Sequence, residues 1–173
     1  MVEKEYLTLI PKNTWVKLHI SMTDTVLDVG IAEGHMWENA YFQITGLDME
    51  PKFKPDIVGR AEALPVKDKS FDIVCLCEIL EHVKNPNIIL MEAVRVARLK
   101  VIITVPWEHL WSAEFAPFNN KMHVRFYTAS SLRKELREIG LPFQIIPIGY
   151  KDEGGLMAWI GAEIYSCAGG LRC

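Results

Sequence analysis

Residues 24–34 read DTVLDVGIAEG, and this is the most informative stretch of the chain. Thr25–Val29 is a short apolar segment that contains one acid, Asp28, and it is typical of a buried strand. Gly30 and Gly34 follow and indicate a tight turn, because glycine adopts backbone conformations that other residues avoid. A strand that runs through a glycine turn into a helix is a common way to hold an adenosine-containing cofactor. The stretch therefore predicts a nucleotide site at the end of a strand.

The rest of the chain alternates between apolar runs that predict strands and amphipathic runs that predict helices. Asn85 and Thr128 are the expected N-caps of the later helices. In the helix over 86–98, the apolar residues are expected to face the sheet, namely Ile88, Ile89, Met91, Val94 and Ala97. In the leading helix, Trp15, Val16 and Leu18 are expected to turn inward. The last two strands are joined by KDEGG, which favours an antiparallel hairpin. The further predicted strands cover 44–48, 56–59, 71–77, 101–105, 144–148 and 156–165, and the predicted helices cover 11–20, 35–42, 86–98 and 129–139. We therefore predict a single α/β domain over residues 1–173. It would have a mostly parallel, seven-stranded, Rossmann-like sheet in a three-layer sandwich, with an antiparallel strand near the C-terminus.

Composition narrows the classes of function. The net charge of -3 gives no basic surface for nucleic acid, so we expect no nucleic-acid partner. The N-terminus does not resemble a signal peptide, and no run approaches the roughly 18 apolar residues of a membrane span. Cys75 and Cys77 lie in the apolar run FDIVCLC and are expected to be buried free thiols. No His/Cys set has zinc spacing. We expect a cytoplasmic protein without a metal, with a small-molecule partner, and with a homodimer left open.

Two acids stand where predicted strands end. Asp28 could accept a hydrogen bond from a cationic amino group. Asp48, about twenty residues later, is placed to accept from both hydroxyls of a ribose. The alternative is that the glycines only shape a turn and the acids only end strands. The loop is not GxGxxG, and neither Lys-Ser nor Lys-Thr follows it. A P-loop is therefore excluded, and a nicotinamide-dependent oxidoreductase ranks low.

The order of these motifs resembles the class I S-adenosylmethionine-dependent methyltransferases, in particular their large small-molecule branch. The most specific part is AEALPVKDKSFDIV followed by EILEHV, and HVRFYTASSLRKELREIG is also similar to that branch. The resemblance covers roughly residues 25–106. It is carried by the segments VLDVGIAEG, ITGLDME, DIVGRAEALPVKDKSFDIVCLCEILEHVKNP and VIITVP.

The resemblance implies S-adenosylmethionine as cofactor and assigns residues to it. Asp28 and Gly30, in the loop with Ala32 and Gly34, would lie by its methionine part. Asp48 would hold the ribose hydroxyls, and Met49 would pack on the adenine. The adenine edge would be lined by Ala61 and Glu62, and the backbone of Cys77 would face the amino-acid end.

Three features depart from the family pattern. Ala32 replaces a glycine of the usual loop, which matters if that position needs a positive φ. Arg60 stands where an aspartate often accepts from the adenine amino group, and a guanidinium has no acceptor atom. Only PKFKP separates the second and third predicted strands, so the usual helix there is expected to be short or missing.

Candidate groups for catalysis follow the fourth predicted strand and a long aromatic connection. His82, in LEHV, and His123, in HVRFY, could act as general bases, although both also fit structural roles. Trp107 and Arg125 are candidates for binding the acceptor. The same connection contains the further aromatic candidates His109, Trp111, Phe115 and Phe118.

Two functions from different classes remain open on the sequence. The first is methyl transfer from S-adenosylmethionine to a small-molecule or glycan-like acceptor. The second is a degenerate relative that binds the cofactor, or nothing, and acts as a partner or regulatory subunit. The departures at Ala32 and Arg60 keep the second hypothesis open, whereas the motif order favours the first.

Overall fold

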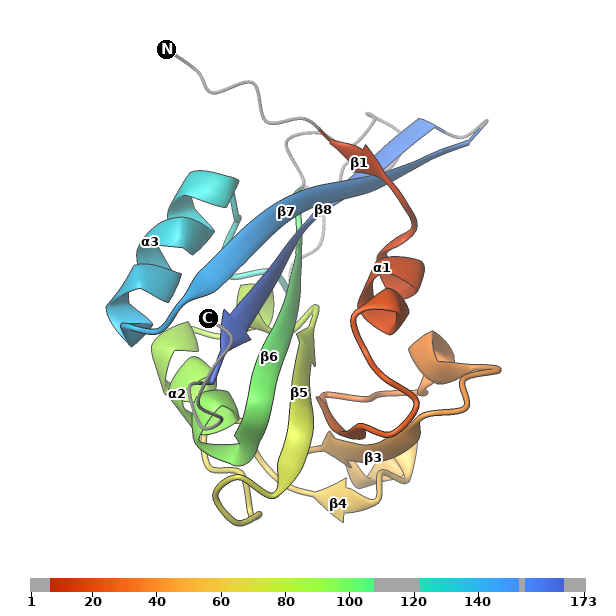
Figure 1. Ribbon diagram of the computed structural model, residues 1–173, viewed down its shortest axis with the longest axis vertical. Helices are drawn as coiled ribbons and strands as arrows, with labels where there is room; N and C mark the ends of the chain where they lie inside the picture. The colour runs from red at the N-terminus through yellow and green to blue at the C-terminus, as the bar shows by residue number, and fades with distance from the viewer. Residues whose placement is uncertain (1–6, 108–121, 153–154, 167–173) are drawn as a thin grey trace.

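The computed structural model describes residues 7–107, 122–152 and 155–166. They form an α/β sandwich in which one sheet lies between two layers of helices (Figure 1). The elements in chain order are β1 (Thr8–Leu9), α1 (Lys12–Leu18), β2 (Thr25–Val29), η1 (His35–Trp37), β3 (Gln43–Asp48), η2 (Pro51–Phe53), β4 (Ile57–Val58), β5 (Phe71–Cys77), η3 (Leu80–His82), α2 (Pro86–Val96), β6 (Ala97–Pro106), α3 (Ala129–Ile139), β7 (Phe143–Asp152) and β8 (Gly155–Tyr165).

Eight strands in the described ranges form a single sheet with the order β1-β7-β8-β6-β5-β2-β3-β4. β8 is antiparallel to both of its neighbours, and the other pairings are parallel, as predicted. The sheet has one strand more than expected, because β1 pairs with the edge of β7 through Thr8 and Leu9. Two residues carry too little pattern to be recognised as a strand. The strand order reverses between β2 and β5, which is where ligands bind in open α/β sheets.

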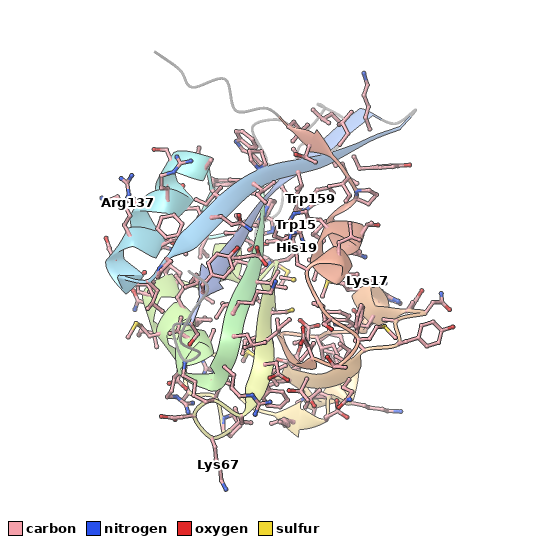
Figure 2. All side chains as sticks on the ribbon, viewed as in Figure 1. Trp15, Lys17, His19, Lys67, Arg137 and Trp159 are labelled. Atoms are coloured by element: carbon pink, nitrogen blue, oxygen red, sulfur yellow. The ribbon has the colours of Figure 1, made fainter. Side chains whose placement is uncertain are left out.

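The helices cover the two faces of the sheet unequally. α2 and α3 pack together on one face, whereas α1 lies on the other (Figure 1). On the α1 face, the ring of Trp15 packs directly on Gly161 of β8, where an added Cβ would lie 2.9 Å from the ring. Figure 2 shows Trp15 and His19 together on this side, and their ring centroids are 4.5 Å apart. The leading helix therefore anchors the chain beside the end of the sheet.

The connections on either side of β3 are short. Residues 49–56, between β3 and β4, contain only the single three-residue turn η2, which confirms that the usual crossover helix is missing. The helix predicted over 35–42 is wrong in length, because the helical part is the single turn η1. The chain leaves helical geometry at Glu38, whose ψ is 132°, and Asn39 then adopts a positive φ of 57°. The connections on both sides of β3 are thus built from turns rather than from helices.

The two long helices follow their capping signals with one exception. Thr128 and Ser131 form a reciprocal capping box at the start of α3, and Gly140 ends the helix in a left-handed conformation. Asn85 occupies the N-cap position of α2 but makes no side-chain capping hydrogen bond. α2 also ends at Val96 rather than near residue 98, because the chain enters β6 directly.

The buried face of α2 differs from the predicted one by one residue. Ile88 and Met91, which were expected to face the sheet, are 48% and 55% exposed, and Leu90 and Ala93 are buried instead. All four residues of the run 88–91 are apolar, so periodicity alone could not choose the face. Leu18 of α1 is likewise exposed rather than buried. None of the helices in the described ranges has the length and apolar character needed to cross a membrane.

Candidate active site

The glycine loop after β2 is tied to the end of β3. The N–H groups of Gly30 and Ile31 donate to the carbonyl of Leu47 at 2.7 and 3.1 Å. Gly30 has a φ of 77°, and a Cβ on it would lie 2.1 Å from Cδ1 of Ile79. Gly34, with a φ of 71°, donates to the Ile31 carbonyl and closes the turn before η1. Both glycines therefore meet backbone and packing requirements of the loop itself.

Asp48 joins the end of β3 to the glycine loop. Its side chain is buried, and Oδ2 accepts a hydrogen bond from the Ala32 N–H at 3.1 Å. Oδ1 accepts from the N–H of Glu50 at 2.8 Å. A carboxylate has about four lone-pair positions, so each oxygen keeps one further acceptor position. The geometry therefore leaves Asp48 able to accept from two neighbouring hydroxyl groups.

Ala32 occupies a position that favours glycine. Its φ is 46°, in the left-handed region, so the condition under which the replacement matters is met. A side chain in this conformation costs about 1–2 kcal/mol relative to an unstrained residue. The hydrogen bond from Ala32 to Asp48 holds this backbone in place, so the loop keeps its shape at some expense in stability.

Asp28 lies in β2, two residues before Gly30 of the loop, and its side chain is buried. It is 4% exposed, and its Oδ2 accepts a hydrogen bond from Nε1 of Trp37 at 2.6 Å. Burial raises the pKa of Asp28 to about 7, against the opposing effects of the Trp37 hydrogen bond and of Lys12. The role of Trp37 was missed by the sequence analysis, because it depends on how the η1 turn aims the ring. Asp28 is therefore a carboxyl group whose charge changes near neutral pH.

The predicted adenine side lies at the ends of β3 and β4. The side chain of Met49 is 54% exposed and available for packing against a ring. Nη2 of Arg60 donates to Oε1 of Glu62 at 3.1 Å, so the arginine that departs from the family pattern pairs with a residue predicted to line the adenine edge. Ala61 is partly buried against the core. In this arrangement one carboxylate oxygen of Glu62 is paired with Arg60.

Part of the specific motif at residues 61–74 is held in place by contacts with α2. Arg95 donates to the carbonyls of Leu64 and Val66 at 3.0 Å each, and it forms an ion pair with Glu92 at 2.7 Å. Glu92 in turn accepts from the N–H of Leu64 at 2.8 Å. Lys69 donates to carbonyls at the end of α2. These contacts hold residues 64–69, between β4 and β5, against α2, so this part of the motif has a structural role.

The end of β5 carries a strained acid. Cys77 is the last residue of β5, one strand away from Asp28, and Glu78 follows with a positive φ of 58°. The Glu78 carboxylate accepts from Thr104 at 3.2 Å and from Nε1 of Trp159 at 3.1 Å. Lys12 lies 3.7 Å from it. Burial raises the pKa of Glu78 despite these contacts. Strained residues cluster at functional sites, which makes this position part of the candidate site.

The two predicted catalytic histidines meet in space. The ring centroids of His82 and His123 are 4.7 Å apart, with the ring planes at 72°. Nδ1 of His82 lies 3.1 Å from the carbonyl oxygen of Met122. His82 and Glu62 line the same surface pocket, which connects the predicted adenine side with the histidine pair. The sequence named both residues, but it gave no sign of their contact.

The two predicted acceptor-binding residues, Arg125 and Trp107, make contacts with the core of the fold. The guanidinium of Arg125 donates to the carbonyls of Val83 and Lys84 and to Glu135 of α3. These contacts place Arg125 as a clamp between η3 and α3, and acceptor binding by it stays a prediction. Trp107 is partly buried against the α2 core. The other aromatic candidates of the connection, His109, Trp111, Phe115 and Phe118, lie outside the described residues.

Comparison with known proteins places this fold among methyltransferases. Residues 27–104 match the family model described as a methyltransferase domain. A methyltransferase from Thermotoga maritima, described as a possible histamine N-methyltransferase, is similar with a TM-score of 0.67 at 17% identity, over 89% of this chain and 87% of that one. A methyltransferase from Methanosarcina mazei is similar with a TM-score of 0.63 at 14% identity, over 91% and 98% of the two chains.

A third similar structure is a methyltransferase from Haloferax volcanii in complex with the Trm112 methyltransferase activator. Its TM-score is 0.64 at 16% identity, over 86% of this chain and 87% of that one. No curated protein sequence matches the chain. At these identities, the solved structures show that the fold is shared. The family model matches the sequence itself, over residues 27–104. The described fold is that of solved S-adenosylmethionine-dependent methyltransferases, so both findings agree with the resemblance found in the sequence.

Proposed function

We propose that this chain transfers a methyl group from S-adenosylmethionine to a small-molecule or glycan-like acceptor. The observation that carries the proposal is the Asp48 carboxylate. It is buried at the end of β3, fixed by two backbone N–H groups, and keeps one acceptor position on each oxygen. This is the arrangement that two vicinal ribose hydroxyls require.

The remaining cofactor contacts follow from the same edge of the sheet. Asp28 would accept from the ammonium group of the cofactor, and its ionised form would be stabilised by that charge. The exposed side chain of Met49 would pack on the adenine. Glu62 and Ala61 would line the adenine edge, and the Cys77 backbone would face the amino-acid end. Gly30, Ala32 and Gly34 shape the loop on which these contacts depend.

Methyl transfer is an in-line displacement at carbon. A lone pair of the acceptor attacks the methyl carbon, the carbon–sulfur bond breaks, and the sulfonium becomes a neutral thioether. Positioning of the two reactants supplies much of the rate, so few protein groups need to take part in the reaction. When the acceptor atom is a hydroxyl, His82 or His123 would take its proton. His82 lies in η3, just after the carboxyl end of β5, and His123 is in contact with it.

A partner or regulatory role is the second candidate function. It is favoured by the ion pair between Arg60 and Glu62, which occupies the side of the pocket expected to recognise adenine. The strain at Ala32 points the same way. We place the protein in the cytoplasm, in line with the free thiols of Cys75 and Cys77.

Titration of the protein with S-adenosylmethionine and S-adenosylhomocysteine by calorimetry tests the proposal. The Asp48→Asn variant is expected to bind at least about tenfold more weakly, because hydrogen bonds to a charged group contribute about 1.5–3 kcal/mol. Asp68→Asn is the matched control, since that side chain is 74% exposed. Absence of binding at millimolar ligand would contradict the proposal and favour the partner role. Binding of a nicotinamide dinucleotide instead would favour an oxidoreductase.

A further inference from the structure

Glu81, His82 and His123 form a cluster at the carboxyl end of β5. One carboxylate oxygen of Glu81 and one ring nitrogen of each histidine all lie within 4.8 Å of one another. Two imidazoles and one carboxylate are a donor set that binds Zn²⁺, Mn²⁺, Fe²⁺ and Co²⁺ in proteins. The sequence analysis predicted no metal site, because His123 lies far along the chain from the other two residues.

The backbone holds the two halves of the cluster together. The N–H groups of Val124 and Arg125 both donate to the carbonyl of Glu81, at 2.9 and 3.2 Å. The side chain of Arg125 adds hydrogen bonds to the carbonyls of Val83 and Lys84, at 2.9 and 2.5 Å. His123 is therefore fixed next to His82 by contacts on both sides of it in the chain. Donor atoms fixed by the fold lose little freedom when a ligand binds.

The hydrogen bond of His82 selects one ring nitrogen for a ligand. Because a carbonyl oxygen only accepts, the contact at 3.1 Å to Met122 requires a proton on Nδ1 of His82. In the neutral ring, Nε2 then carries the lone pair. Metal-binding histidines in proteins commonly donate their other ring N–H to a backbone carbonyl in this way. The contact to Met122 is thus the supporting interaction that a ligating histidine has.

The charges around the cluster favour a cation. Glu81 is 1% exposed, and a buried carboxylate interacts strongly with a nearby positive charge because the local dielectric constant is low. Glu78 lies close enough to His123 for their charges to interact. Lys12, 3.7 Å from Glu78, offsets part of this negative charge on the side facing β8. A divalent ion among Glu81, His82 and His123 would face two carboxylates and no cation within its own ligand set.

We infer that Glu81, His82 and His123 form a binding site for a divalent transition-metal ion. Ligand atoms around tetrahedral Zn²⁺ lie about 3.4 Å apart, so the donors need to close by at most about 1.4 Å, within reach of side-chain rotation. Three protein ligands leave a coordination position for water or for an acceptor oxygen. Use of that position in catalysis rests on the proposed function, and the bound ion would then lower the pKa of the acceptor hydroxyl in place of a histidine base. Metal binding itself does not rest on the proposed function.

The inference is tested on the full chain after chelator treatment, by titration with Co²⁺ and Zn²⁺. One ion per chain is expected, and the Co²⁺ spectrum should show nitrogen and oxygen ligation. The His82→Ala/His123→Ala double variant should bind at least about 100-fold more weakly, and Glu81→Gln at least about tenfold. The control is His35→Ala, because that exposed histidine pairs only with Glu38 in the described contacts.

Thiols supply the main competing ligands, since the chain also contains four cysteines. A Co²⁺ spectrum dominated by thiolate ligation, or equal affinity in the double variant, would overturn the inference. Lack of any binding by the wild-type chain at millimolar metal would do the same. Titration of metal-free protein with S-adenosylhomocysteine is measured in parallel, so that failure of the metal site and failure of the cofactor site are distinguished. Melting temperatures of the variants establish that each is folded.

Discussion

Cofactor affinity is expected to rise with pH between 6.0 and 7.0, because Asp28 must be ionised to bind an ammonium group. Burial raises the pKa of Asp28 to about 7. About half of the free protein then carries the charge at pH 7.0 and about one tenth at pH 6.0. If only the ionised form binds, the apparent dissociation constant is about fivefold larger at pH 6.0. The amino group of the ligand stays protonated over this range, since α-amino groups titrate near pH 7.7–8.0.

Calorimetry with S-adenosylhomocysteine at pH 6.0, 6.5 and 7.0 measures this effect. Repeating the titrations in buffers of different ionisation enthalpy gives the number of protons released on binding. Asp28→Asn keeps an oxygen acceptor for Trp37 and should bind more weakly, without the pH dependence. Glu78, whose pKa is also raised by burial, is the competing titrating group, so Glu78→Gln serves as the control and should keep the dependence. A flat wild-type profile, or an unchanged slope in Asp28→Asn, would refute the reasoning.

Two predictions concern stability. Ala32→Gly should raise the melting temperature by about 2 °C, because relief of about 1–2 kcal/mol of strain exceeds the backbone entropy lost with glycine, about 0.5–1 kcal/mol. Ala32→Val should lower the melting temperature, and a stabilised valine variant would contradict the strain argument. Arg95→Ala should destabilise the fold by about 2 kcal/mol, or about 4–8 °C, because the segment after β4 loses its hydrogen bonds. Lys67→Ala is the control, since that side chain projects into solvent (Figure 2), and equal melting temperatures for these two variants would count against the clamp.

Elements with strong local signals were predictable from sequence. β2 and β5 have the predicted bounds, because each is a short apolar run that ends at a turn or an acid. α3 begins after Thr128 and ends before Gly140, as its capping residues indicated. The closing hairpin and the missing crossover helix also followed from glycine and proline placement. Local backbone chemistry decides such elements, so distant contacts did not change them.

Features that depend on packing were not predictable in the same way. The buried face of α2 could not be chosen from a run of four apolar residues, and β1 exists only because β7 offers an edge to it. η1 stops after one turn and thereby aims Trp37 at Asp28. The spacing of residues in the sequence does not predict the hydrogen bond between Trp37 and Asp28. Together with burial, this hydrogen bond affects the pKa of Asp28.

The sequence by itself predicted the methyltransferase-like fold, the glycine loop and the strand ends that carry Asp28 and Asp48, because these depend on motifs that are local along the chain. Tertiary structure alone decided that His82 and His123 lie in contact and that Glu81 is buried beside them. Each of these depends on how separate segments are brought together, and for His82 and His123 the backbone of residues 124–125 docks on Glu81. The spacing of motifs along the chain predicts where strands end. Which side chains share a site is decided by contacts between segments that are distant in sequence.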